Sequence, residues 1–198
     1  MSSHYTDVDR LILERWNEVL DLQDAFKGLN DRMREAIDGV LAKTERWLDD
    51  QGYKCDRDSK TPEISAWKPS WEAKKGQPAI RLTIGEFGPH AYGRVRSDHP
   101  YLWVMTANLD LLKLKEPERV QFARDLRKAL GPAAAMWDDE EVSDADSPLG
   151  RYLSDVPDGK RVEMAGQPQQ LLDFLQSRFS ELFELAPAID ATLAAIRR

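Results

Sequence analysis

The chain has one cysteine, Cys55, among its 198 residues, so no internal disulfide bond can form. It also lacks a run of about eighteen apolar residues, the minimum length for a membrane-spanning helix. Its first residues show no basic group followed by an apolar stretch, as a signal peptide would. We therefore expect a cytoplasmic protein that neither spans nor binds a membrane.

Motifs specific to a reaction are missing as well. The sequence contains no Gly-x-Gly-x-x-Gly, no Gly-x-x-x-x-Gly-Lys-Ser/Thr and no Gly-x-Ser-x-Gly, which removes the common nucleotide-binding and hydrolase classes. Its three histidines, His4, His90 and His99, do not have the spacing of a metal site. We expect no cofactor and no metal, and a non-catalytic role is favoured over an enzymatic one.

The net charge is −7, which disfavours non-specific binding to nucleic acid or to an anionic membrane. The charge is unevenly distributed along the chain. Residues 51–98 hold 9 basic and 6 acidic groups, whereas the segments on both sides are acidic. A basic surface is therefore expected only in the middle of the chain.

A seven-residue apolar repeat runs through the first quarter of the sequence, opposite a row of polar residues that includes Asn17, Asp24 and Asp31. This pattern predicts one long amphipathic, coiled-coil-like helix. At about 1.5 Å per residue, some 45 residues span close to 70 Å, more than a domain of this size covers. The apolar positions, which we predict to form an interaction surface, are Ile12, Trp16, Val19, Leu22, Phe26, Leu29, Met33, Val40 and Trp47.

Capping signals bound this helix. Thr6 followed by Asp9 resembles a capping box at its start, and Gly52 supplies a residue that turns the chain out of a helix. Gly28 leaves two possibilities, a continuous helix or a hairpin in which Asn30 caps a second arm. Continuity is favoured because the repeat crosses Gly28 without a shift in register.

Beyond Gly52 the pattern becomes that of short strands. Four are expected, at residues 64–67, 79–84, 91–96 and 101–107, and their short connectors rich in turn residues favour an antiparallel sheet. Apolar residues on both faces of the last strand place it away from the sheet edge. Residues 151–164 are expected to form a small hairpin that turns at Pro157.

The last third is expected to be mainly helical. One helix begins near Pro117 and stops at Gly131, and a second amphipathic stretch starts at Pro168 and is divided by Pro187. The predicted fold is therefore α+β, with a long helix over residues 1–52 and an α+β domain over residues 53–198 that ends in amphipathic helices.

The basic segment 54–96 supports an alternative function. Glu63, Glu72 and Lys74 have the residue types of a metal-dependent nuclease site. However, Glu72 does not lie in a strand-like pattern, so we expect Glu72 and Lys74 on an exposed connector, pointing to solvent with ordinary ionisation. Trp67 and Trp71 alternate with lysines and, together with Arg94 and Arg96, would suit a surface that stacks nucleic-acid bases.

The long helix carries the favoured hypothesis. We expect a protein-interaction or assembly protein, such as an adaptor, a regulator or a subunit of a complex, that associates through its helices with itself or with another protein. The metal-dependent nuclease or nucleic-acid-binding protein remains the alternative. No sequence feature identifies the partner.

Overall fold

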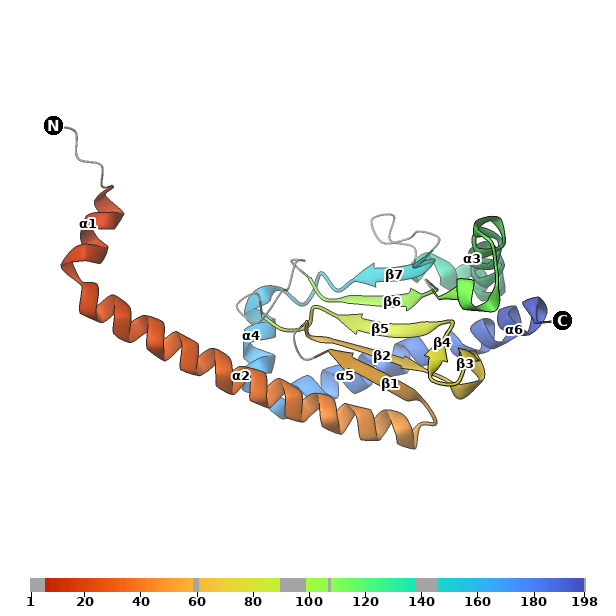
Figure 1. The fold of residues 1–198 in the computed structure, drawn as a ribbon, viewed down its shortest axis with the longest axis horizontal. Helices are drawn as coiled ribbons and strands as arrows, with labels where there is room; N and C mark the ends of the chain where they lie inside the picture. Colours follow the sequence, from red (N-terminus) through yellow and green to blue (C-terminus); the bar gives the residue numbers. More distant parts are fainter. Residues whose placement is uncertain (1–5, 59–60, 90–98, 107, 138–145, 198) are drawn as a thin grey trace.

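The structure, a computed structural model, describes residues 6–58, 61–89, 99–106, 108–137 and 146–197. A long N-terminal helix packs on the other helices and strands with its second half. Its first half projects well beyond them (Figure 1). The fold is α+β, with a long N-terminal helix, an antiparallel sheet and C-terminal helices, as the sequence predicts.

The N-terminal part consists of two helices. Helix α1 (Asp7–Glu14) is capped by Thr6 and Asp9 in the predicted capping box, with Oγ1 of Thr6 accepting a hydrogen bond of 3.2 Å from the Asp9 amide. Helix α2 (Trp16–Asp50) continues through Gly28 and ends just before Gly52, whose φ is 81°. The hairpin alternative is therefore wrong, and within residues 6–50 the predicted helix breaks only at Arg15.

The main sheet has five antiparallel strands in the order β1–β2–β5–β6–β7. These strands are β1 (Lys54–Asp58), β2 (Glu63–Trp67), β5 (Arg81–Gly85), β6 (Tyr101–Met105) and β7 (Leu149–Tyr152). The sequence predicted β2, β5 and β6 and placed β6 correctly away from the sheet edge. The expected strand at 91–96 lies outside the described residues.

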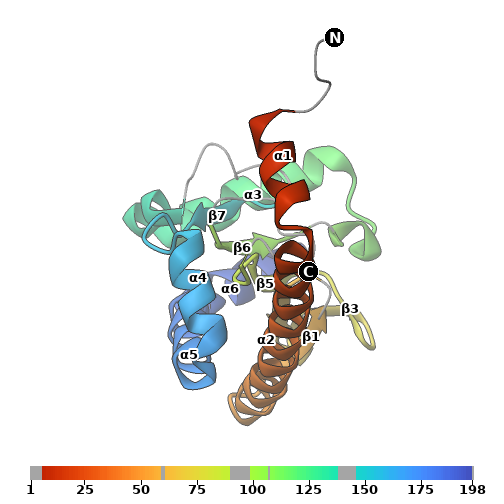
Figure 2. The same ribbon diagram turned by 90° about the vertical axis from the view of Figure 1, so that its left-hand side faces the viewer.

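Helices cover one face of the sheet. Ile64, Leu82, Ile84, Leu102 and Val104 alternate along β2, β5 and β6, and all five are fully buried. They form one core with the inward residues of α2 and α5 (Pro168–Phe183), which pack against each other, α5 behind the sheet and α2 along its β1 edge (Figures 1 and 2). The alternating apolar residues of the strands and the apolar faces of the helices thus pack together in one layer.

The remaining elements complete the domain. The short strands β3 (Glu72–Lys74) and β4 (Gln77–Pro78) form a separate hairpin. Three 3₁₀ helices, η1 (Pro69–Trp71), η2 (Leu109–Leu112) and η3 (Gly131–Trp137), connect larger elements, and helix α3 (Glu116–Leu130) follows η2 and ends at Gly131 as expected.

The expected hairpin at 151–164 is wrong. Pro157 precedes helix α4 (Asp158–Gly166), and β7 pairs with β6 instead of with a neighbour in sequence. Pro157 is extended, with φ −69° and ψ 170°, and caps the start of α4, so a sequence read as a turn begins a helix. As predicted, the C-terminal stretch is divided near Pro187, which lies in the first turn of α6 (Ala186–Ile196), shortly after the end of α5.

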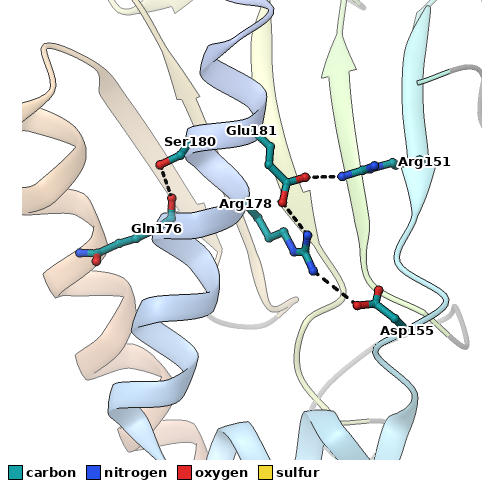
Figure 3. A network of polar contacts seen from close by, with 6 residues as sticks. All are labelled: Arg151, Asp155, Gln176, Arg178, Ser180 and Glu181. Carbon is teal, nitrogen blue, oxygen red and sulfur yellow. Dashed lines mark hydrogen bonds and ion pairs between the residues drawn. The ribbon is translucent and has the colours of Figure 1, made fainter. Parts of the chain in front are cut away.

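A polar network ties α5 to the sheet edge (Figure 3). Glu181 on α5 accepts hydrogen bonds from Arg151 on β7 and from Arg178 one helical turn away, and Arg178 also lies 3.5 Å from Asp155. Two arginines therefore face two carboxylates, so the network is balanced in charge and serves the packing of α5 on the sheet.

Candidate interaction surface

The first half of the long helix carries apolar side chains that its own domain does not cover. None of the residues of α1 is buried, and the first buried residue of α2 is Met33. Leu22, Phe26 and Trp16 leave 70%, 54% and 52% of their surface exposed. The other large apolar residues exposed on these helices are Val8, Leu11, Ile12, Leu13, Leu20 and Leu29.

The predicted interaction residues therefore divide into two groups. Ile12, Trp16, Leu22, Phe26 and Leu29 are exposed, and Val19 is half-buried. The remaining three meet the chain's own domain. Met33 and Val40 are buried in the core, and Trp47 stacks on Phe183 with ring centroids 5.8 Å apart. Only the first group is available to a partner, and we call the surface from Val19 to Leu29 the projecting seam.

Two exposed apolar residues of α1 escaped the sequence reasoning. Val8 lies fourteen residues before Leu22, so extending the repeat backwards would have included it, whereas Leu11 lies beside the repeat, one residue before Ile12. Exposed apolar residues scattered singly are normal on a protein surface, whereas here they form a row along a projecting helix. The surface runs from α1 to the point where α2 enters the domain.

Charged and polar residues flank the projecting seam. Glu18 is exposed and its carboxylate lies 3.4 Å from the guanidinium of Arg15 on the same helix. Arg32 is also exposed and lies back over Gly28, where an added Cβ would be 3.4 Å from its Nη1 atom. On the other flank, the buried side-chain oxygen of Asn30 has no hydrogen-bond partner in the protein.

The basic middle segment does not form an open site around its two tryptophans. Trp71 is fully buried, and its indole N–H donates a hydrogen bond of 2.6 Å to Asp190. Trp67 is buried as well and donates to Glu72, which also accepts a hydrogen bond of 2.7 Å from Lys54. These bonds lower the pKa of the Glu72 carboxyl to about 2, so the expectation of a solvent-directed Glu72 with ordinary ionisation is wrong.

The other alternative-site residues lie apart. Glu63 lies at the start of β2 and accepts a hydrogen bond from the Tyr101 hydroxyl. Trp67, which donates to Glu72, lies at the other end of β2. At about 3.3 Å per residue, Glu63 and Trp67 are about 13 Å apart along the strand. Lys74 is exposed on β3, and Arg94 and Arg96 lie outside the described residues. Within the described parts of the chain, no three His, Cys, Asp or Glu side chains are placed to share a metal ion.

An open hollow of about 680 Å³ lies between the end of α2 and β1. Its polar lining includes Glu45, Arg57 and Cys55, and Nε of Arg57 lies 3.3 Å from Glu45. Burial, followed by the charge of Glu45, raises the pKa of the Cys55 thiol to about 11. The thiol is therefore protonated near neutral pH and is a poor nucleophile.

No family model, curated protein or solved structure matches this chain. Among the described helices, none has the length and apolar character required to cross a membrane.

Proposed function

We propose that this chain is a non-catalytic protein-interaction or assembly protein that associates through the exposed face of α1 and the first half of α2. One observation carries the proposal. The apolar repeat of α2 continues without a shift from the exposed residues Leu22 and Phe26 to the buried residues Met33 and Val40. The same stripe that packs on the domain at one end has nothing to pack on at the other.

The energetic reason is the cost of leaving this face in water. Burying a large apolar side chain contributes about 1.5–3 kcal/mol, so several such residues in one row strongly favour a covered state. An isolated helical projection also gains little from helix propensity alone, since most helical stability in proteins comes from packing of an amphipathic face. A partner would bury the apolar face and would also supply the packing that stabilises the helix.

Replacing Phe26 with Asp tests the proposal. A buried, unpaired carboxylate in the projecting seam would cost several kcal/mol of association. The matched control is Asp24→Ala, on the polar side of the same helix. We expect light scattering at about 50 µM to report an assembly for the unaltered chain and the control, and a monomer for Phe26→Asp. An assembly that survives Phe26→Asp would contradict the proposal.

A further inference from the structure

The exposed helix allows a more specific inference, which rests on the proposed function. We propose that the partner is a second copy of this chain and that the two helices pair antiparallel, with their centre at residue 24. In this register Val19 lies opposite Leu29 of the second copy, and Leu22 opposite Phe26. Each pair occurs twice by symmetry, so four apolar layers cover the projecting seam.

Charge complementarity supports this register. Glu18 immediately precedes Val19, and Arg32 immediately precedes Met33, so both lie on the same flank of the stripe, fourteen residues apart. Antiparallel helices bring like flanks together, and a centre at residue 24 places Glu18 beside Arg32 of the second copy, twice per pair. In a parallel pair, Glu18 would instead meet the flank that carries Gln23, and no opposite charges would face each other.

The other flank supplies an independent observation. It carries Trp16, about half exposed, and Asn30, whose buried side-chain oxygen has no partner. The same antiparallel register places Trp16 beside Asn30 of the second copy. The indole N–H is a donor and the amide oxygen is an acceptor, and because that oxygen is shielded within its own chain, the Asn30 side chain must turn outward to accept from Trp16.

The break between α1 and α2 fits the same arrangement. In this register Arg15 lies opposite Met33 of the second copy, the residue at which that helix enters its own domain. Beyond this point the seam of the second copy is already occupied, because Ile37, Val40 and Leu41 are buried in its core. A straight helix would run on against that domain, whereas the chain changes direction at Arg15 (Figure 1).

Neighbouring antiparallel registers lose these features. A shift of one heptad toward the domain would require Met33 and Ala36 as contact residues, although Met33 is only 9% exposed. A shift of one heptad the other way places Glu18 beside Ala25 of the second copy and leaves Arg32 without a carboxylate. The register centred on residue 24 is the one in which exposed apolar residues and opposite charges both find counterparts.

Distances between spin labels test the orientation. Single labels are attached at Asn17→Cys, Asp24→Cys or Asp31→Cys, all exposed on the polar side, in a Cys55→Ser background. In the proposed dimer, the label pair at 24 has no axial offset, whereas the pairs at 17 and at 31 are offset by about 21 Å along the helix. We expect the shortest electron–electron distance at 24 and longer, similar distances at the other two sites.

Charge exchange tests the register. Glu18→Lys and Arg32→Glu should each weaken the dimer roughly tenfold in dissociation constant, and the double variant should recover most of that loss. Equal label distances at all three sites, or a double variant weaker than both single variants, would overturn the antiparallel inference while leaving association intact. A monomeric unaltered chain would overturn the inference that the partner is a second copy.

Discussion

Trp71 and Asp190 lie 119 positions apart in the sequence, and the indole N–H of Trp71 donates a hydrogen bond of 2.6 Å to the Asp190 carboxylate. Asp190 also accepts from Lys68 at 2.6 Å, so one carboxylate on α6 holds both ends of the turn that carries η1. The bond therefore joins the C-terminal helix to the connector after β2. A tryptophan that resembles a base-stacking residue in the sequence has a structural role.

The first prediction concerns this bond. Asp190→Ala leaves the buried indole N–H of Trp71 without an acceptor, which should lower the free energy of unfolding by about 1–3 kcal/mol. Asp190→Asn keeps an acceptor and should lose less. Urea unfolding measures both, and an Asp190→Ala variant as stable as the unaltered protein would show that the bond contributes nothing.

A second prediction uses two glycines. The ring of Tyr101 lies over Gly85, and a Cβ at Gly85 would be 2.0 Å from the Tyr101 Cζ atom. Gly85→Ala should therefore displace the ring and destabilise the sheet by about 1–3 kcal/mol. Gly39→Ala, in α2 with no atom within 4 Å, is the control and should be neutral or stabilising by up to about 1 kcal/mol. Thermal melting distinguishes the two, and equal effects would contradict the close approach.

The third prediction follows from the lowered pKa of Glu72, about 2 in the folded protein. Because the pKa is lower in the folded than in the unfolded state, the carboxylate stabilises the fold above the unfolded pKa of about 4.3. That contribution is lost as the pH falls from about 4.3 to 2. Glu72→Gln should therefore narrow the difference in urea midpoint between neutral pH and pH of about 3. If Glu72→Gln leaves the difference in urea midpoint between the two pH values unchanged, the Glu72 carboxylate does not stabilise the fold.

The fourth prediction concerns Cys55. Since burial raises the pKa of its thiol to about 11, only a very small fraction is thiolate near neutral pH. A disulfide reagent should therefore modify the folded protein far more slowly than the chain in denaturant. Equal rates in the two states would show that the thiol is open to solvent.

Periodicity in the sequence predicted the elements with strong repeats. Helix α2, strands β5 and β6, and the division near Pro187 follow from regular apolar spacing and from proline chemistry. Strand β1 escaped prediction because Lys54–Asp58 is almost entirely polar, as suits an edge strand, and its register is fixed by pairing with β2. The break at Arg15 has no glycine or proline to mark it.

The candidate surface was predicted only in part. The repeat identified the stripe, but it could not show that coverage by the domain begins at Met33, because that depends on where α5 lies in space. The burial of Trp71 likewise depends on Asp190, far along the chain. Local pattern predicts which side of a helix is apolar, whereas tertiary contacts decide which part of that side stays free.

We propose that the exposed half of α2 associates with a second copy of the chain. Sedimentation velocity of the unaltered chain between about 1 and 100 µM tests it most directly, because a monomer and an assembly differ in sedimentation coefficient. We predict that the coefficient rises with concentration toward that of a dimer and that Leu22→Asp abolishes the rise. A single monomeric coefficient over the whole range would show that this half of α2 does not pair with a second copy.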